Sequence, residues 1–344
     1  MRYMNRQTDW SNEMKKIDFV ILWVDGSDPE WLEQKNKYSP QKVDYSSGDN
    51  RFRDWNNLQY FFRGIEKFAP WVNNIYFITW GHIPKWLDTS NPKLKIVRHD
   101  EFIPKKYLPT FNSNTIELNL HRIHELSEHF VLFNDDTFII DKVSPKDFFQ
   151  KGLPKDELIL NPILPKGEKY RISYTNLNNM NIINTYFNKN SVIKKYPKKV
   201  FSLKYGKELF RTFLLMPWSS FVGFTNPHLP NPHLKSTFSL LWKKENEKLN
   251  ASCMNRFRGL NDLSHWLMRY WNLCSGKFVP RDRTFGKFFI LSQNNSDIVS
   301  HITERKTKTI CINDMSTDFD FDTVKSEINS AFEKILHEKS SFEL

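Results

Sequence analysis

Residues 130–136 have the sequence FVLFNDD, in which four apolar residues are followed at once by an amide and two carboxylates. Apolar β-formers that end in turn-forming residues predict a buried strand, and Asn134, Asp135 and Asp136 follow its last residue. In open α/β sheets ligands bind beyond the carboxyl ends of the strands, so we expect both carboxylates at a binding edge. Adjacent carboxylates repel each other unless a cation lies nearby, and Mg²⁺ prefers oxygen ligands. The stretch therefore indicates a metal or phosphate site, with a simple turn as the alternative.

Other apolar runs along the chain also end close to acidic residues. Residues 17–23 (IDFVILW) precede Asp25, residues 94–97 precede Asp100, and residues 309–312 precede Asp314. Short apolar runs bounded by turn residues predict buried strands of a parallel sheet, and residues 74–80 predict one more. If these strands share a sheet, several of the carboxylates should meet at one edge.

Helical spacing of apolar residues fills the gaps between the predicted strands. It covers residues 58–68 and 114–128, and Asn114 and Glu117 have the spacing of a capping box at the start of the second helix. Strand–helix–strand alternation predicts βαβ units and a mostly parallel sheet, which is an α/β fold. Further helices are predicted over residues 206–216, 235–249 and 261–274, and around Val324, Ile328, Phe332 and Ile335.

Composition and periodicity divide the chain into three regions. Residues 1–150 carry the alternation of strands and helices and form the expected α/β core. Residues 151–220 are mostly rich in Lys, Asn and Pro with weak periodicity, so we expect an insertion that faces an acceptor. Residues 221–344 add helices and the last core strand, which complete the site.

The overall composition narrows the class of protein. The 344-residue chain has 39% hydrophobic and 15% aromatic residues, which is ample for a packed core and argues against disorder. It has 11 Gly and no G-x-G-x-x-G or G-x-x-x-x-G-K-[ST] motif, so a glycine-rich phosphate loop is not expected. Cys253, Cys274 and Cys311 are odd in number and widely spaced, which argues against a disulfide framework or a Cys-based zinc site and favours a reducing compartment.

The net charge of +11 allows three classes of partner, namely nucleic acid, an anionic membrane face and polyanionic molecules. Nucleic-acid-binding motifs are absent from the sequence, so we expect no nucleic acid. The local Lys cluster at residues 194–199 (KKYPKK) indicates either a solvated face or a contact with anionic lipid or an anionic acceptor. Neither a signal peptide nor an apolar run of ~18 residues is found. We therefore expect a cytoplasmic protein, with peripheral contact with the inner face of the cell membrane left open.

Several other positions carry residue types suited to catalysis or binding. His228 lies in residues 226–233 (NPHLPNPH), where three prolines stiffen the loop. A rigidly held imidazole suits a general base, and an incidental surface histidine is the alternative. Arg258 suits phosphate oxygens or is a solvated residue beside a helix. Three roles are open for Glu117, namely catalysis, metal binding and capping of the helix. For Asp25 the alternatives are contact with a nucleotide and formation of a turn.

Four blocks of the sequence resemble, in order, the conserved blocks of the Stealth family of sugar-phosphate transferases. That family includes bacterial capsule polymerases and the GlcNAc-1-phosphotransferase of lysosomal enzymes. The similar blocks are residues 17–31 (from IDFVILWVDG), 51–139 (from RFRDWNNLQYFF to FVLFNDDTFI), about 224–275 (from NPHLPNPHLK through RFRGLNDLSHWLMRYW) and 308–315 (KTICINDM). The third block is looser. The chain departs from the family at Gly64, where Ser is common, and in offering both His228 and His233.

The resemblance implies a nucleotide-sugar-binding core of the Rossmann-like GT-A type, with helical additions and an inserted subdomain. It implies His228, Arg258, Glu117 and Asp136 as catalytic residues, and Asp25, Gly26, Arg53, Asn134 and His233 as substrate-binding residues. It also implies that Glu117, Asp135, Asp136 and Asp314 bind Mg²⁺ or Mn²⁺. The choice between His228 and His233 as the base stays open.

The resulting hypothesis is transfer of a sugar 1-phosphate from a UDP-sugar to a hydroxyl of an oligosaccharide or polysaccharide acceptor, with release of UMP. The reaction would serve bacterial capsule or surface polysaccharide synthesis, with an N-acetylhexosamine donor and UDP-GlcNAc favoured. The alternative is a metal-dependent GT-A glycosyltransferase, which releases UDP. A catalytically silent capsule-assembly scaffold and a nucleic-acid-binding module are the remaining alternatives.

Overall fold

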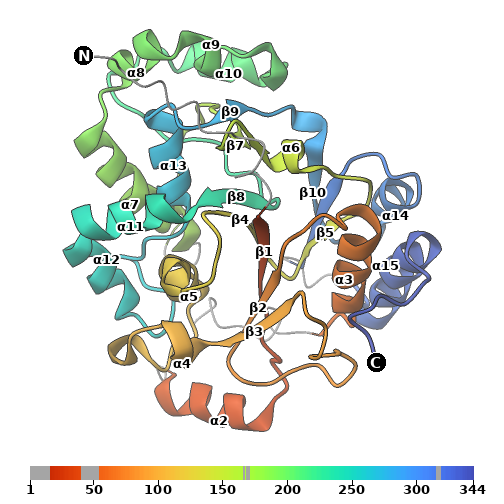
Figure 1. The fold of residues 1–344 in the computed structure, drawn as a ribbon. Coiled ribbons are helices and arrows are strands. Elements are labelled where there is room, and N and C mark those ends of the chain that lie inside the picture. The colour runs from red at the N-terminus through yellow and green to blue at the C-terminus, as the bar shows by residue number, and fades with distance from the viewer. Residues whose placement is uncertain (1–15, 40–53, 166, 168–170, 315–318) are drawn as a thin grey trace, which may run out of the picture.

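The structure is a computed structural model that describes residues 16–39, 54–165, 167, 171–314 and 319–344. A central sheet lies between two layers of helices, with α5, α11 and α13 on one side and α3, α14 and α15 on the other (Figure 1). Across the described residues, none of the helices combines the length and the apolar character that a membrane-crossing segment needs.

The central sheet has five strands in the order β3-β2-β1-β4-β8. Their bounds are β1 Ile17–Leu22, β2 Ile75–Thr79, β3 Leu94–Arg98, β4 His129–Phe133 and β8 Asn231–Leu234. The first four are parallel to their neighbours, and only β8 runs antiparallel, to β4. The predicted α/β class with a mostly parallel sheet is therefore confirmed, and so are the four strands predicted before residue 140.

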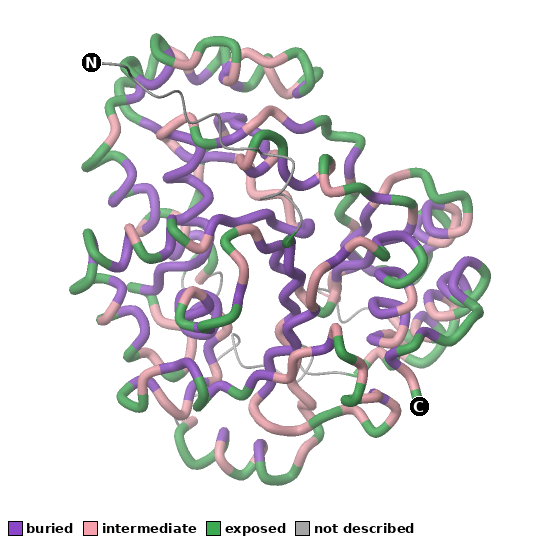
Figure 2. Tube along the Cα trace, viewed as in Figure 1, coloured by how far each residue is buried: buried purple, intermediate pink, exposed green. Residues whose placement is uncertain are grey.

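Burial on both faces explains why these strands have continuous apolar sequences. Successive side chains of a strand point to opposite faces, and here each face packs into its own core. Val20 and Leu132 join the core on the α11 and α13 side, whereas Phe19, Val131 and Phe133 join the core on the α3 and α15 side. A strand covered on both faces has no polar side to expose, as is usual for parallel sheets. Figure 2 shows this continuous burial along the central strands.

The helices mostly follow the predicted spacing. Their bounds are α2 Pro29–Tyr38, α3 Leu58–Phe68, α4 His99–Phe102, α5 Ser113–Asn119, α6 Pro145–Phe148, α7 Arg171–Tyr186, α8 Lys189–Lys195, α9 Pro197–Val200, α10 Glu208–Leu214, α11 Lys235–Lys244, α12 Asn246–Cys253, α13 Trp266–Cys274, α14 Ser296–Thr303 and α15 Phe321–Ile335. The four spaced apolar residues of the C-terminal helix are all buried, which confirms that prediction. The predicted helix over 235–249 is divided at Glu245 into α11 and α12.

The predicted helix over 114–128 is wrong in its length and in its cap. The N-cap is Asn112, whose side chain accepts from the Asn114 backbone N–H, so Asn114 and Glu117 do not form a capping box. The α-helix ends at Asn119, whose side-chain amide donates to the Thr115 carbonyl, and a 3₁₀ turn at Leu120–Arg122 follows. The apolar residues beyond it are buried, but they belong to a loop and not to a helix. Glu117 is thereby free of a capping role.

A second sheet, in the order β10-β11-β5, lies beside α14 and α15. Its strands are β5 Thr137–Ile139, β10 Gly286–Ile290 and β11 Thr309–Asn313. The strand predicted near residue 310 therefore exists, but it does not belong to the central sheet, and the expectation of one shared edge is wrong in this respect. The chain passes from β4 to β5 through residues 134–136, so Asp136 lies where the two sheets meet.

Helices α7 to α10 and two strands of a third, small sheet lie between residues 149 and 220. The strands of this sheet are β6 Phe149–Gln150, β7 Leu153–Asp156 and β9 Val279–Pro280, in the order β6-β7-β9. Helix α7 carries Met180, Ile182 and Ile183 into the same core as Leu132. The described part of residues 151–220 thus shares a core with the central sheet, and the division into three regions stays a prediction.

Candidate active site

Asp136 occupies the turn between β4 and β5, and three side chains from two other segments contact its carboxylate. Its Oδ2 accepts from the Asn313 side-chain amide at 2.8 Å and lies 3.4 Å from Nε2 of His228. The Cys311 thiol of β11 also donates to the carboxylate. Burial alone would raise the pKa of Asp136, but His228, Asn313 and Cys311 together lower it. Asp136 is therefore a stable anion at neutral pH.

The turn itself is built by Thr137, whose backbone and side chain both bond to Asn134. The Thr137 hydroxyl donates to the Asn134 carbonyl at 2.7 Å, and the Thr137 N–H donates to the same carbonyl at 3.1 Å. The Ile312 N–H of β11 donates to the Asp136 carbonyl at 2.9 Å. The turn that was the alternative interpretation is therefore present and it presents the carboxylates, whereas the metal or phosphate role stays a prediction.

His228 lies beside this turn, and 39% of its side chain is exposed. Its Nε2 lies 2.9 Å from the side-chain amide nitrogen of Asn134 as well as 3.4 Å from Asp136. A protonated Nε2 suits the carboxylate, whereas an unprotonated Nε2 suits the amide N–H. Although burial acts to lower it, the pKa of His228 is raised by Asp136 and then by Glu117 and Asp135. The imidazole is thus a stronger base than an isolated histidine.

Asp135 extends from the same turn and is exposed. Loss of water contacts around the carboxylate raises its pKa to about 7, and the charge of Asp136 acts in the same direction. The pKa values of these two neighbouring carboxylates are thus shifted in opposite directions.

Glu117 and Arg258 form the opposite side of the site. Glu117 is buried on α5, and desolvation raises its pKa to about 7 in spite of Arg258 and His228. Ser113, at the first turn of α5, donates to Glu117 and accepts from Nη2 of Arg258 at 2.9 Å. His265 lies 4.0 Å from Glu117. Glu117 and Asp136 both influence the charge of His228, so the structure places these three predicted residues together, with Arg258 beside Glu117.

His233 lies apart from this surface. It is fully buried in β8, where its Nε2 faces Nδ1 of His265 at 3.1 Å. Desolvation lowers its pKa to about 3, so the ring is neutral. In this structure the predicted substrate-binding role does not fit His233, because its imidazole does not reach the surface. Of the two histidines of the loop sequence, only His228 can meet a substrate.

The remaining predicted residues lie in several places. The Asp25 carboxylate accepts from the N–H and the hydroxyl of Ser27, at 2.9 and 2.6 Å. The backbone N–H of Asp25 donates to Nε2 of His82 at 2.7 Å. Asp25 and Gly26 thus form the turn that was the alternative interpretation. Asp314 follows Asn313 directly and is half-buried. Arg53 lies outside the described residues.

Sequence reasoning missed the buried contacts that hold the His228 loop. Arg269 of α13 is buried, and its guanidinium donates twice to the Asp156 carboxylate at 2.8 Å. It also donates to the Thr225 carbonyl at 2.8 Å and to the Asn226 side chain at 3.2 Å, and the Tyr270 hydroxyl donates to the same Asn226 oxygen at 2.8 Å. We call these five residues the loop clamp. The available signal was an arginine within the otherwise apolar sequence of α13.

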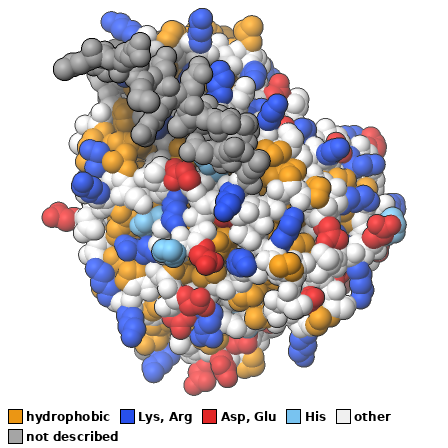
Figure 3. All heavy atoms as spheres, viewed as in Figure 1, with side chains coloured by type: hydrophobic (Ala, Val, Ile, Leu, Met, Phe, Trp, Pro, Cys, Tyr) orange, Lys and Arg blue, Asp and Glu red, His pale blue; other side chains and the backbone are white. Residues whose placement is uncertain are grey.

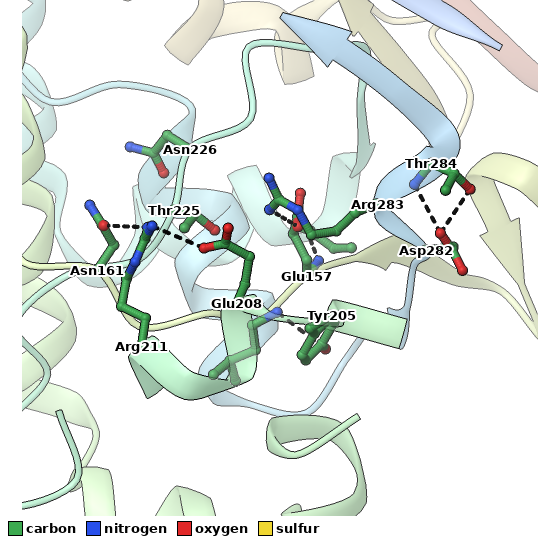
Figure 4. A network of polar contacts seen from close by, with 12 residues as sticks. Glu157, Asn161, Tyr205, Glu208, Arg211, Thr225, Asn226, Asp282, Arg283 and Thr284 are labelled. Atoms are coloured by element: carbon green, nitrogen blue, oxygen red, sulfur yellow. Dashed lines mark hydrogen bonds and ion pairs between the residues drawn. The ribbon is translucent and has the colours of Figure 1, made fainter. Parts of the chain in front are cut away.

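Figure 4 shows Thr225 and Asn226 of the clamp beside a more exposed ion pair. There Arg283 donates to Glu157 at 2.7 Å. Over the face shown in Figure 3, Lys and Arg are interspersed with acidic side chains and do not form one continuous basic patch. On this face the positive charge is therefore distributed.

Asp136, His228 and Cys311 offer ligand atoms that lie within 4.8 Å of one another. Burial raises the pKa of the Cys311 thiol well above its usual range, so the sulfur keeps its proton. A metal ion binds the thiolate and would first have to displace this proton, so Cys311 is the least favourable donor of the three. The carboxylate oxygens of Asp136 and its neighbour Asp135 suit a hard cation such as Mg²⁺.

Comparison with known protein families gives two matches. The model for Stealth protein CR1, conserved region 1, matches residues 15–43, and that for Stealth protein CR2, conserved region 2, matches residues 51–156. These positions agree with the first two blocks recognised in the sequence.

Similar proteins extend over nearly the whole chain. The capsular polysaccharide phosphotransferase WcwK of Streptococcus pneumoniae is 46% identical over 96% of this chain and 98% of its own. The receptor polysaccharide phosphotransferase WefC of Streptococcus oralis is 41% identical over 96% of this chain and 100% of its own. The exopolysaccharide phosphotransferase cps2G of Lactiplantibacillus plantarum is 40% identical over 95% of this chain and 96% of its own.

Solved structures show only remote similarity. The bifunctional glycosyltransferase WbbM has a TM-score of 0.39 at 9% identity, over 93% of this chain and 52% of its own. The galactosyltransferase LgtC has a TM-score of 0.35 at 9% identity, over 91% of this chain and 95% of its own. The fold is established by the strand order described above.

Proposed function

This chain belongs to the Stealth protein family, and we propose from this premise that it transfers a sugar 1-phosphate from a UDP-sugar to a hydroxyl of a glycan acceptor. The relatives of similar length are named polysaccharide phosphotransferases, which supports phosphotransfer in capsule or surface polysaccharide synthesis. The observation that carries the proposal is the position of His228, whose Nε2 lies 3.4 Å from Asp136 and whose pKa is also raised by Glu117 and Asp135. UDP-GlcNAc is the donor that we propose first.

In the proposed step, the acceptor oxygen attacks the sugar-bearing β-phosphorus of the donor. The new oxygen–phosphorus bond forms as the bond to the bridging oxygen of UMP breaks, and UMP leaves. The acceptor proton passes to Nε2 of His228. The amide of Asn134 and the carboxylate of Asp136 flank this atom and favour its two protonation states in turn. General-base help of this kind contributes about 10²–10⁴ in rate.

Arg258 would bind a phosphate oxygen on the other side of His228. Guanidinium–phosphate hydrogen bonds are charge-assisted and strong, and phosphoryl transfer depends chiefly on positioning and charge neutralisation. The Arg258 side chain is oriented by the Ser113 hydroxyl, which in turn contacts Glu117. Glu117 would therefore act through Ser113 and Arg258, and its predicted role as a metal ligand is secondary in this proposal.

Asp135 and Asp136 are suited to hold a divalent cation, Mg²⁺ or Mn²⁺. Among the described residues, the buried Oδ1 of Asp136 has no hydrogen-bond partner, and desolvation together with the charge of Asp136 raises the pKa of Asp135. Both observations fit an oxygen-ligated cation. When bound, such an ion would neutralise charge on the diphosphate. Asp314 is a further candidate ligand because it follows Asn313, which contacts Asp136.

A product analysis tests the reaction. The protein would be incubated with a panel of UDP-sugars, a divalent cation and a glycan acceptor, and the products examined by phosphorus NMR. We expect a phosphodiester signal together with stoichiometric UMP. Release of UDP without a phosphodiester would instead establish a glycosyltransferase and contradict the proposal.

A further inference from the structure

Five large apolar side chains are exposed within one short segment of the chain. They are Leu203, Phe210, Phe213, Leu214 and Trp218, with Leu203 88% and Phe210 68% exposed. We call these five residues the apolar ridge. Single exposed apolar residues are ordinary in soluble proteins, but a contiguous set marks a binding surface. The ridge belongs to the region around α8, α9 and α10 at the top of Figure 1.

The geometry of α10 directs the ridge outwards. Phe210, Phe213 and Leu214 have the i, i+3, i+4 spacing that places them on one helix face. On the opposite face Thr212 is buried, and its hydroxyl accepts from the Leu160 N–H at 3.2 Å. The amphipathic helix α15 instead buries its apolar face in the core. Helix α10 is therefore an amphipathic helix whose three apolar side chains are each more than half exposed, although the ring of Phe213 also contacts Phe201.

Several contacts hold the ridge in a fixed position. Arg211 pairs with the Glu208 carboxylate at 3.0 Å and donates to the Asn161 side chain at 2.8 Å (Figure 4). The ring of Phe213 stacks on Phe201 with centroids 5.1 Å apart. After α10, Nζ of Lys189 donates to the carbonyls of residues 215 and 216 at 2.9 Å and to that of residue 218. The surface is thus preformed and does not need to fold on binding.

Basic side chains surround the apolar ridge. Between residues 194 and 218 the sequence has seven Lys and Arg residues and one acidic residue, Glu208. The exposed members are Lys194, Lys195, Lys198, Lys204, Lys207 and Arg211. We call these six residues the basic rim. An apolar helix face bearing Phe and Leu, flanked by Lys and Arg, is the composition of helices that lie in the interface of anionic membranes.

We propose that the apolar ridge and the basic rim dock this protein onto the anionic surface of a lipid bilayer. The ridge enters the region between headgroups and acyl chains, and the rim contacts the anionic headgroups. A second copy of the chain fits this surface less well, because a symmetric dimer would bring two positively charged rims together. This inference does not depend on the proposed reaction, since it rests on residues outside the site.

Vesicle flotation tests the docking surface with the full-length protein. Vesicles of phosphatidylcholine with about one third phosphatidylglycerol would be compared with vesicles of phosphatidylcholine alone, since each basic residue near an anionic surface contributes about fivefold in partitioning. We expect strong flotation with the anionic vesicles and little with the neutral ones. Raising NaCl from about 0.1 M to about 1 M should weaken it, because screening shortens the reach of the charges.

Two matched pairs of variants locate the contact. Phe210→Ser should lower partitioning about tenfold, as the apolar side chain no longer enters the bilayer, whereas Ile290→Ser, at a 51% exposed position of β10, should not. Lys204→Glu with Lys207→Glu should lower it at least about 25-fold. The control is Lys37→Glu with Lys334→Glu, on α2 and α15, which are both exposed and far from α10. All these side chains are exposed, so unchanged thermal unfolding would show that the variants fold.

Three results would overturn the proposal. These are equal flotation with neutral and anionic vesicles, equal loss in the Phe210 and Ile290 variants, or no flotation together with a dimer that Phe210→Ser dissociates. The last result, seen by analytical ultracentrifugation, would assign the ridge to self-association.

Discussion

Replacement of Arg269 by lysine should strongly destabilise the protein although it conserves the charge. The guanidinium of Arg269 donates to Asp156 and Glu157 and to Thr225 and Asn226 of the His228 loop. A lysine ammonium is a compact group that cannot reach all of these acceptors at once. Breaking a buried ion pair costs about 3–5 kcal/mol, and the retained charge should limit the loss to about 3 kcal/mol.

That free energy converts into a shift in melting temperature. Unfolding entropy is about 2.1 cal/mol/K per residue, or about 0.7 kcal/mol/K for 344 residues, so Tm should fall by about 4 °C. Urea denaturation gives the free energy and a thermal scan gives Tm. Arg283→Lys is the matched control, since Arg283 pairs with Glu157 at 2.7 Å but is 43% exposed in its side chain. An exposed pair contributes about 0–1 kcal/mol.

The same variant tests whether the clamp positions His228. In assays at saturating donor and acceptor, we expect Arg269→Lys to lower kcat while leaving the affinity for the proposed UDP-sugar donor unchanged, because the loop carries the proposed base and not the proposed diphosphate site. Arg283→Lys should leave both unchanged. A free energy of unfolding that differs by less than about 1 kcal/mol between the two variants would refute the reasoning on the clamp.

Four further outcomes follow from individual residues. His228→Ala should lower turnover about 10²–10⁴-fold while UDP-sugar binding, measured by calorimetry, is retained. The control is His337→Ala, at an exposed position. Asp136→Asn should weaken the dependence of donor binding on Mg²⁺, and an unchanged Mg²⁺ titration would argue against its role. Gly64→Ala should destabilise the protein by about 1–3 kcal/mol, because its Cβ would lie 2.6 Å from the Ile139 carbonyl oxygen in a packed core. Burial lowers the pKa of His99 to about 3, so the unfolded chain binds the proton more tightly. The stability of the wild type relative to His99→Asn should be constant above pH ~6.5 and decrease by about 1.4 kcal/mol per pH unit below it, as measured by urea denaturation.

The central strands could be predicted from the sequence because burial on both faces leaves continuous apolar runs. The packing of α3 and α15 could be predicted for a similar reason, since their buried residues follow helical spacing. The end of α5 could not, because apolar spacing continues past Asn119 while the side chain of Asn119 bonds back to the helix. The local spacing of apolar residues predicts which residues are buried. It does not predict whether those residues lie in a helix or in a loop.

Several residues of the candidate site could be proposed from the sequence, but their connections could not. The acids at residues 135 and 136 follow from the end of a strand, and His228 follows from a stiff loop. That Asn313 and Cys311 would contact Asp136 depends on β11 pairing with β5, and such pairing between distant segments leaves no local signature. The loop clamp is an intermediate case. An arginine in an apolar helix requires a buried anion, but the sequence does not identify that anion as Asp156.

The position of Asp136 between two sheets explains how the site can be rigid although its residues lie in turns and loops. The backbone of Asp136 is fixed at both ends, by β4 before it and by the hydrogen bond from the Ile312 N–H after it. Its side chain is held by Asn313 of the second sheet. Through Asp156 and Arg269, the His228 loop is fixed to the third sheet and to α13. A displacement of any one sheet would thus change the distance between the base and the carboxylates. Phosphoryl transfer depends on such positioning, and within the described part of the chain three sheets joined by buried polar contacts support it.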